Sequence, residues 1–312
     1  MAELRTSCKN KFDMKKLVFY WVLFFASIAG KAQTGISGQV KADYVPFSNY
    51  IRPIDSVKTD SKSDFKRVQA ALEIPLSLKM VDENKPKLWS LYLQGSYAAM
   101  ENKYYDEKLF PAELLNAQIG LKHIRPIGGK WSMMATLSVG IYTDLEQITI
   151  DDVLLQGGVL FIKNFKPNLA FGFGPVLTNA FGVPMVLPGI YFNWETQTAL
   201  HFKIAFPEGA EIGYRFTPNF DLKAVVELDG MTAEVSRDGK SKLLGYQQII
   251  AGIRPQSKLG EHWTIDFTAG STLTRSFQTN DRKLSDIFKE KDMANPKFST
   301  TFYGAVALKW KF

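Results

Sequence analysis

Three histidines are the side chains of this sequence best suited to acid-base chemistry, at His123, His201 and His262. A serine hydrolase needs a Ser activated by a His, and the His must be oriented by Asn, Asp or Glu. His123 and His262 lie beside predicted turns, and His201 lies within a predicted strand beside Lys203, without a His-x-Ser signature. A polar lining role therefore fits His201 better than catalysis, and we expect no enzyme.

Other chemical motifs are weak. Asp151 and Asp152 are adjacent carboxylates in a predicted loop, where solvation or weak binding of a divalent ion is usual. No metal-ligand spacing, phosphate loop or dinucleotide fingerprint is present. The glycines at 157–158 and 172–174 fall within predicted strands, where Gly usually marks curvature or a bulge. The sequence thus predicts no catalytic residue, no metal and no cofactor.

The elements that must position the polar side chains are strands. Residues 65–80 are a clear example, because apolar residues from Val68 to Met80 alternate with polar ones from Arg67 to Lys79. The same two-residue period recurs at 36–44, 89–97, 115–121, 131–141, 169–177, 198–206, 212–216, 220–228 and 263–273. Helical periodicity does not compete in these windows. The sequence predicts an all-β fold.

Strand length favours a membrane barrel over a soluble sandwich. Many segments run for about 9–15 residues, longer than soluble strands and long enough to cross a bilayer when tilted. Aromatic residues cluster at their ends: Trp89, Trp131, Trp194, Trp263, Trp310, Tyr44, Tyr97, Tyr142 and Tyr214. Trp and Tyr favour the bilayer interface. We therefore expect one closed antiparallel transmembrane β-barrel.

The connections alternate between short and long, as outer-membrane barrels require. We expect fourteen strands: 36–44, 65–80, 88–100, 114–125, 130–142, 153–162, 168–178, 188–194, 197–206, 210–216, 219–229, 243–254, 262–274 and 298–312. The pair 188–194 and 210–216 is the weakest, and merging it gives twelve. The longest predicted external loops are 45–64 and 275–297, with a short surface helix at 286–292. Such loops bind partners or simply contact lipopolysaccharide.

Charged and polar side chains on the inward face are the candidate functional residues. On this register they are Arg67, Glu73, Lys79, His201, Lys203, Glu211, Arg215, Asp221, Lys223, Glu227 and Asp266. They either line a water-filled channel and select small solutes, or pair across the interior and close it. We favour a narrow or gated pore.

The N-terminus predicts export. Residues 14–32 combine a basic start, an apolar run and small residues before Gln33, as in a secretory signal peptide. We expect 1–32 to be this leader, with a possible upstream start-site extension, and 33–312 to be the barrel. Removing 1–32 takes six of 38 basic and two of 31 acidic residues, so the net charge falls from +7 to +3. The basic balance is therefore no evidence for nucleic-acid binding. The sole cysteine, Cys8, also leaves with the leader.

The last strand, 298–312, has an almost wholly apolar face and ends on an aromatic residue. It resembles the C-terminal assembly signal of Gram-negative outer-membrane β-barrels, with Phe302, Val306, Leu308, Trp310 and Phe312 carrying the resemblance. With the leader and the amphipathic strands, the chain looks most like an uncharacterised porin-like barrel family of Bacteroidota.

That resemblance implies a place in the outer membrane. It also implies contact with membrane lipid and lipopolysaccharide, and dependence on periplasmic chaperones and the outer-membrane assembly machinery. The function that it implies is porin-like passage of small solutes, passive or selective. The alternative is a non-conducting structural or surface-binding barrel of the adhesin or receptor type.

Overall fold

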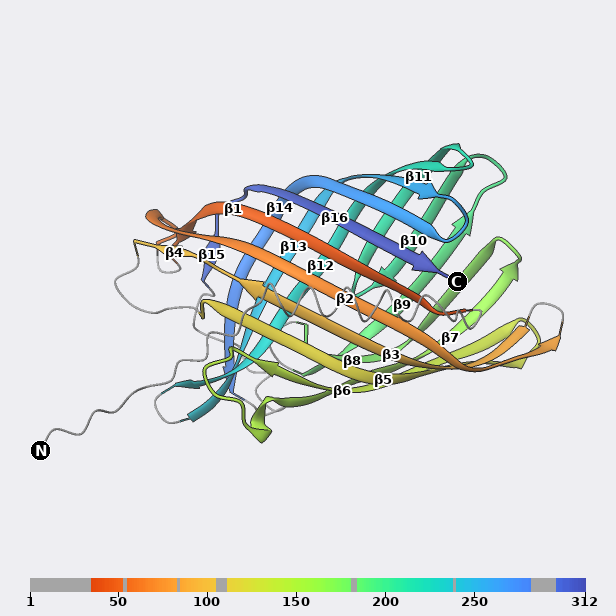
Figure 1. Cartoon of the computed structure of the whole chain (residues 1–312), viewed down its shortest axis with the longest axis horizontal. Coiled ribbons are helices and arrows are strands. Elements are labelled where there is room, and N and C mark those ends of the chain that lie inside the picture. The colour runs from red at the N-terminus through yellow and green to blue at the C-terminus, as the bar shows by residue number, and fades with distance from the viewer. Residues whose placement is uncertain are drawn as a thin grey trace, which may run out of the picture.

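A computed structural model describes residues 35–52, 55–82, 85–104, 111–180, 184–237, 240–281 and 296–312. These residues form one sheet that closes on itself, because β1 pairs with both β2 and β16 (Figure 1). The strands are β1 (Ser37–Ile51), β2 (Lys58–Asp82), β3 (Lys85–Ala99), β4 (Asn102–Lys103), β5 (Glu113–Gly128), β6 (Trp131–Thr143), β7 (Val153–Lys166), β8 (Leu169–Thr178), β9 (Met185–Glu195), β10 (Leu200–Phe206), β11 (Gly209–Thr217), β12 (Phe220–Arg237), β13 (Lys240–Leu259), β14 (Trp263–Asp281), β15 (Lys297–Phe298) and β16 (Phe302–Lys311).

The predicted closed antiparallel barrel is confirmed. The sheet has sixteen strands in the described residues, of which β4 and β15 are only two residues long, so fourteen strands form the wall. The alternative of twelve is wrong, because β9 and β11 both form and each pairs with the strands on either side of it. We call the end that carries Ser37 and Phe312 the inner end, and the opposite end the outer end.

No helix in the described residues is long and apolar enough to cross a membrane. A short 3-10 helix, η2 (Ile150–Asp152), precedes β7 and is capped by the Thr149 side chain.

Two predicted outer loops are largely strand. β1 continues to Ile51 and β2 begins at Lys58, so most of 45–64 is paired. Likewise, β12 runs to Arg237 and β13 begins at Lys240, so the expected loop at 230–242 is a strand hairpin. The polar residues in these segments predicted loops, whereas the strands continue through them beyond the predicted wall. The predicted leader at 1–32 and the predicted helix at 286–292 lie outside the described residues, as does most of 275–297.

The outer surface of the wall is apolar. Exposed side chains that point away from the interior include Val68, Leu121, Leu137, Val139, Phe171, Phe173, Ile204, Ile212, Val226, Ile253, Phe267, Val306 and Leu308. Five tryptophans lie at the inner ends of strands, namely Trp89, Trp131, Trp194, Trp263 and Trp310. An apolar band with an aromatic girdle is the surface that a bilayer solvates.

Strand β12 changes its environment halfway along. From Asp221 to Val226 its residues alternate between buried and exposed, as in a wall with one face toward lipid. From Met231 to Val235 every residue is buried. A strand that is buried on both faces lies inside the barrel, so the outer half of β12 has left the wall.

A bridge between β12 and β6 fixes this departure. Glu234 pairs with Thr143 in parallel orientation, although five strands separate β12 from β6 along the wall. The bridge closes a smaller ring of β6, β5, β3, β2, β1, β16, β14, β13 and β12 at the outer end. Strands β7 to β11 are outside that ring. The barrel is therefore wide at its inner end and narrow at its outer end.

An apolar cluster fills the narrow ring, which we call the outer plug. It is made of Val45, Phe65, Ala98, Met100, Leu114, Met231, Ala233, Val235, Leu244, Tyr246, Ile250, Phe277, Phe298 and Tyr303. Phe65 stacks on Tyr246 with ring centroids 4.3 Å apart, and Phe277 packs against Tyr246 at 5.2 Å. These side chains come from both sides of the ring, so the plug occupies its centre.

Candidate functional site

A belt of paired charges crosses the interior beneath the outer plug, and Arg67 on β2 is its most buried member. Its side chain has no exposed area. Arg67 Nε donates to Asp43 Oδ2 at 3.0 Å, and Arg67 Nη2 pairs with Asp229 on β12. Since β2 and β12 are not neighbours in the wall, the Arg67–Asp229 pair spans the barrel interior.

The belt continues through Glu227 on β12. Lys41 on β1 reaches Glu227 at 3.2 Å, again between strands that are not neighbours, and Arg254 on β13 pairs with the same carboxylate. Arg254 also approaches Glu211 at 3.9 Å, and Lys223 donates to Glu211 at 3.1 Å. Buried charges are tolerated when they are paired in this way, so the belt ties β1 and β2 to β11, β12 and β13.

Arg275 on β14 makes a second tie at the level of the outer plug. Its guanidinium donates to Tyr246 Oη at 3.1 Å, Ser48 Oγ at 3.0 Å, and the carbonyls of Ser63 and Asp64, both at 2.7 Å. It also lies over the Phe298 ring, 4.4 Å from the centroid. A fully bonded guanidinium at this depth holds β14 against β1 and β2, which lie near it on the same side of the narrow ring.

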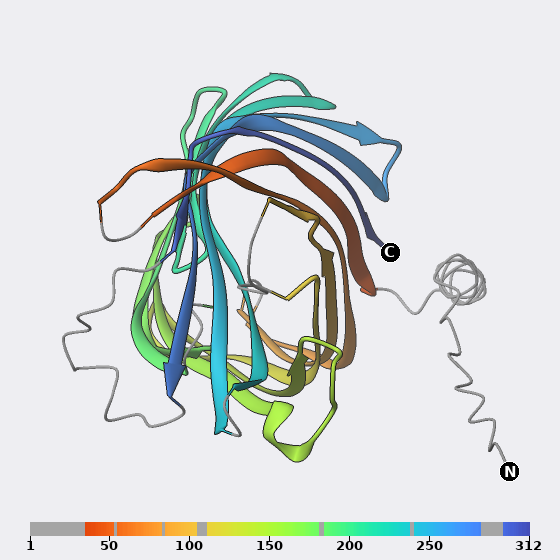
Figure 2. The same ribbon diagram turned by 90° about the vertical axis from the view of Figure 1, so that its left-hand side faces the viewer.

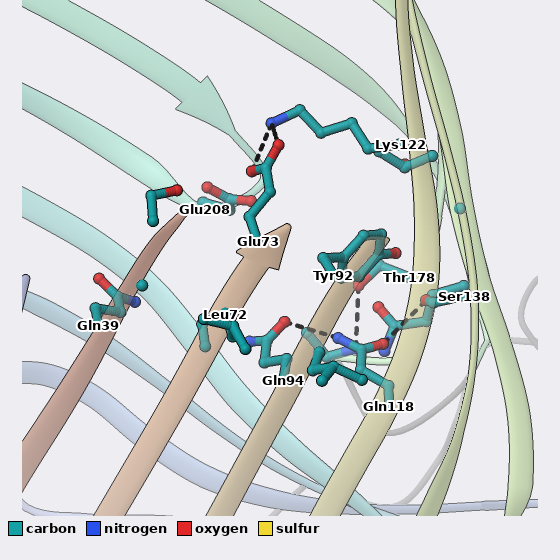
Figure 3. Close-up of a pocket in the computed structure, with 18 of the residues that line it drawn as sticks. Gln39, Leu72, Glu73, Tyr92, Gln94, Gln118, Lys122, Ser138, Thr178 and Glu208 are labelled. Carbon is teal, nitrogen blue, oxygen red and sulfur yellow. Dashed lines mark hydrogen bonds and ion pairs between the residues drawn. The ribbon is translucent and has the colours of Figure 1, made fainter. Parts of the chain in front are cut away.

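A cavity of about 620 Å³ lies on the other side of the belt, inside the wide part of the barrel. Its lining comes from β1, β2, β3, β5, β6, β7, β8 and β16, together with the β10–β11 turn and Leu228 on β12. Figure 3 shows the side chains that face it. The cavity has the size expected of a site for one small molecule.

Neutral amides and hydroxyls dominate the polar part of the cavity (Figure 3). Gln118 is the hub: its Nε2 donates to Gln94 Oε1 at 2.7 Å, and its Oε1 accepts from Ser138 Oγ and Tyr142 Oη, both at 3.0 Å. Gln156 extends the chain by donating to Tyr142 Oη. Such groups both donate and accept, so they can exchange partners with an uncharged polar solute.

One ion pair lies in the cavity wall. Lys122 Nζ donates to both carboxylate oxygens of Glu73, at 2.9 and 3.0 Å (Figure 3). Both side chains remain about a quarter exposed, at 26% and 28%. The pair neutralises itself, so these two residues give the cavity no excess charge. Glu208 in the β10–β11 turn is a further carboxylate in the lining.

Apart from His201, the predicted inward residues divide into four groups by place. Arg67, Glu211, Lys223 and Glu227 are in the belt, and Glu73 is in the cavity wall. Near the inner end, Asp266 pairs with Lys309 at 2.5 Å and Arg215 with Asp221 at 3.5 Å. Lys79 and Lys203 are exposed, with Lys79 near the inner end of β2. Their role as solute-lining residues stays a prediction.

The histidines do not form a catalytic arrangement. His201 packs in the space above Gly213, where any Cβ would collide with the imidazole, and its Nδ1 is buried without a partner. His123 stacks on Trp89 at 3.9 Å, and His262 lies 5.4 Å from the Phe312 ring. These contacts are structural. No group of three potential metal ligands occurs within the described ranges.

Sequence reasoning missed the polar hub and half of the belt. Gln118 and Lys122 lie four residues apart on a predicted strand, so the two-residue period would have placed both on one face. Asp43 and Arg254 carried the same signal. So did Asp229, which lies in the predicted strand 219–229 on the same face as Asp221, Lys223 and Glu227. Which charge pairs with which depends on distances across the barrel that no local pattern contains.

Comparison with known proteins gives a family match over nearly the whole sequence. The family model described as "Domain of unknown function (DUF6268)" matches residues 28–311. No curated protein matches the chain significantly in sequence.

Several solved structures share the barrel shape at low identity. An outer-membrane channel from Pseudomonas putida F1 is similar with a TM-score of 0.47 and 10% identity, covering 90% of this chain and 97% of that one. The translocator domain of the autotransporter NalP from Neisseria meningitidis gives 0.38 and 12%, covering 96% of each. The P. putida toluene transporter TodX gives 0.37 and 8%, covering 92% of each. At such identities, the solute must be deduced from this chain's own side chains.

Proposed function

The chain belongs to the DUF6268 family, whose description states no activity, and we propose from its geometry that it is an outer-membrane channel for small uncharged solutes. The observation that carries the proposal is the cavity of about 620 Å³ inside a barrel with an apolar outer surface. Side chains fill the interior of a closed, non-conducting barrel, whereas a channel needs an open space along the path of its solute.

The chemistry of the cavity supports an uncharged solute. The ion pair of Glu73 with Lys122 is self-neutralising, and Glu208 and Lys309 add one charge of each sign to the lining. The hub around Gln118 offers donors and acceptors without net charge. The apolar side chain of Val176 lines the cavity too. A solute with hydroxyl or amide groups and an apolar part would match both surfaces.

The apolar band, the tryptophan girdle and the terminal Phe312 support an outer-membrane location with the inner end in the periplasm. A leader at 1–32, an origin in Bacteroidota and contact with lipopolysaccharide belong to the same proposal. So does delivery by periplasmic chaperones to the assembly machinery.

Insertion tests the location. Trp310 packs over Gly38 at the β1–β16 seam, and Phe312 N donates to Ile36 O at 2.9 Å while its ring lies 5.9 Å from Trp263. The double variant Trp310→Gln, Phe312→Gln should accumulate outside the outer membrane, as membrane fractionation would show. Normal insertion of this variant would contradict the assembly role of the last strand.

Transport tests the function. We expect purified full-length protein in proteoliposomes to admit small uncharged polar molecules, and to show brief, infrequent conductance steps in planar bilayers because the outer plug is closed. Lys122→Glu should shift any conductance toward cations, since it replaces the pair by two carboxylates. Lys163→Glu is the matched control, because the half-buried Lys163 side chain lies over the Trp131 ring at 5.4 Å and does not line the cavity. It should leave selectivity unchanged.

A non-conducting barrel is the second candidate, because the outer plug packs fourteen apolar residues into the outer end. A folded barrel that admits no solute and stays electrically silent would establish that alternative and remove the channel.

A further inference from the structure

The outer plug separates the cavity from the outer mouth. Its side chains are almost completely buried, with Phe65, Tyr246 and Tyr303 at 0% exposure. The belt below it adds Arg67, which is paired on two sides. A solute moving along the barrel axis would have to displace the side chains of both layers, so the outer mouth is closed in this structure.

The wall has a notch at the β10–β11 hairpin. β10 pairs with β9 only from Ile190 to Glu195, so the segment Met185–Gly189 has no β10 partner on that side. The ladder of β11 with β12 ends at Gly209 and Glu227, and Leu228 N then donates to Glu208 O at 2.8 Å. Beyond Leu228, β12 turns into the barrel. The notch therefore lies between β9 and β12, above the Pro207–Glu208 turn.

The notch has a defined upper border. Thr232 Oγ1 donates to the carbonyl of Asn179, and the Ala180 carbonyl lies so close to Gly230 that a Cβ there would collide with it. Asn179 and Ala180, which follow β8, thus touch β12 beyond the notch. Glycine at 230 is required for this approach.

The height of the notch places it against the bilayer. β10 has seven residues, whereas a tilted strand needs about 9–11 to cross the hydrocarbon core. With the inner end at the periplasmic interface, the Pro207–Glu208 turn therefore lies below the outer interface. An opening at this height faces lipid, not water.

The cavity reaches this notch. Thr178, Ala180, Pro207, Glu208 and Leu228 are part of its lining, and all of them border the notch. The same cavity extends along β5, β3 and β2 to Ser37 at the inner end of β1. One continuous hollow therefore joins the inner end of the barrel to the side of the wall.

From this geometry we propose that the solute crosses the wall through a side portal, formed by Thr178, Ala180, Pro207, Glu208 and Leu228, and not through the outer mouth. The proposal rests on the channel function proposed above and narrows its substrate class. A solute that enters the portal meets lipid on one side and the amide hub on the other. It is therefore a small uncharged amphipathic molecule.

The first experiment locks the outer ring. Thr143 and Glu234 are register partners, so cysteines at both positions lie at a separation that a disulfide can bridge. Cys8 is the sole native cysteine, and a full-length Cys8→Ser background removes it. In proteoliposomes, the oxidised Thr143→Cys, Glu234→Cys variant should take up a small uncharged amphipathic fluorophore as fast as its reduced form. Uptake that is lost on oxidation and restored by reduction would overturn the portal.

The second experiment blocks the portal. Glu208→Cys, modified with a bulky maleimide, should lose uptake of the same fluorophore. Asn219→Cys is the matched control, because Asn219 is an exposed residue of the next hairpin turn and does not line the cavity. Its modification should leave uptake unchanged. Unchanged uptake after complete modification of Glu208→Cys would also overturn the proposal, and this test does not depend on the disulfide.

The two proposals fail differently. If the Cys8→Ser protein, without any maleimide modification, takes up neither the fluorophore nor another small uncharged solute, the channel function itself is contradicted. If the protein takes up these solutes and modification of Glu208→Cys does not change the uptake, the channel function is retained and the side portal is contradicted.

Discussion

The outer and inner halves of this barrel share one sheet but have opposite interiors. In the outer half, Phe65, Tyr246 and Phe277 pack with their neighbours into an apolar plug. In the inner half, Gln94, Gln118 and the partly exposed pair of Glu73 with Lys122 border a hollow. Their outward faces are alike, since apolar side chains cover both. Lipid requires apolar side chains on the outward face along the whole barrel, whereas the side chains of the interior can be apolar in one half and polar in the other.

Strand β12 creates the difference. While it stays in the wall, up to Glu227, fourteen strands surround a space too wide for side chains to fill. Where it crosses toward Thr143, the ring narrows and side chains meet. The view from the outer end shows the ribbons of β12 and β13 running inside the curve of β7 to β9 (Figure 2). One strand that leaves the wall is thus enough to convert a hollow barrel into a half-filled one.

The contrast between the two halves predicts the largest loss of stability for a substitution at Arg67, which lies on the border between them. Arg67→Ala leaves the carboxylates of Asp43 and Asp229 buried without their partner. Removing one partner from a buried pair costs about 3–5 kcal/mol. We expect this loss in denaturant unfolding of the detergent-solubilised barrel, followed by tryptophan fluorescence.

A triple variant separates charge from volume at the same site. Arg67→Met with Asp43→Asn and Asp229→Asn keeps the side-chain volumes and removes every charge of the triad. Replacing a buried ion group by neutral residues of similar volume is often neutral or stabilising. Stability close to wild type is therefore expected. A triple variant as weak as Arg67→Ala would show that packing, and not unpaired charge, holds the border.

The second prediction compares the two faces of β14. Phe277 is 1% exposed in the outer plug, whereas Phe267 is 49% exposed on the outward face. Phe277→Ala should cost about 3–5 kcal/mol, because it opens a cavity in packed protein. Phe267→Ala leaves no such cavity, since detergent or lipid fills the space. The same unfolding assay measures both, and equal losses would mean that the outer half is not packed.

The sequence predicted the wall better than the interior. The two-residue period at 169–177 or 220–228 reflects lipid on one face, and the structure has β8 and β12 there. The period fails at 231–235 and at Leu243 and Leu244, where both faces are buried. Consecutive apolar residues such as Leu243-Leu244 are a local signal of burial on two faces. Their place inside the ring depends on Thr143, which is distant in sequence.

The site was predictable only in part, for a related reason. Alternation put Glu73, Glu211 and Glu227 on the inward face, but it carries no information about partners across the barrel. The predicted strands 197–206 and 210–216 leave an unusually short connection at 207–209, which is the sequence signal of the notch at β10. Its meaning depends on the path of β12.

A smaller effect is expected in the hollow. Lys122→Met removes the partner of Glu73, as Arg67→Ala removes that of Asp43, but here both side chains reach the open cavity. Pairs that solvent can reach contribute about 0–1 kcal/mol. Unfolding should therefore be almost unchanged. A loss as large as that of Arg67→Ala would mean that the cavity is as dry as the plug, and the contrast between the halves would disappear.

The smallest effect sharpens the contrast at the outer rim. Asp144 follows β6, and burial raises the pKa of its carboxyl, with Glu146 and Asp152 adding to the rise. A carboxyl with a raised pKa in the fold stabilises below its unfolded pKa of 3.8, and that stability is lost as the pH rises through the folded value. Asp144→Asn keeps an oxygen to accept from Glu146 N, a bond of 3.0 Å, and has no charge to bury. It should therefore unfold at a slightly higher denaturant concentration than wild type at neutral pH, and the gain should vanish in acid. The exposed Glu261→Gln at the inner end controls for the loss of one negative charge. If Asp144→Asn and Glu261→Gln raise the denaturant midpoint equally, the gain reflects net charge alone. Asp144 would then not be buried in the fold, and the packed region of the outer half would end with β6.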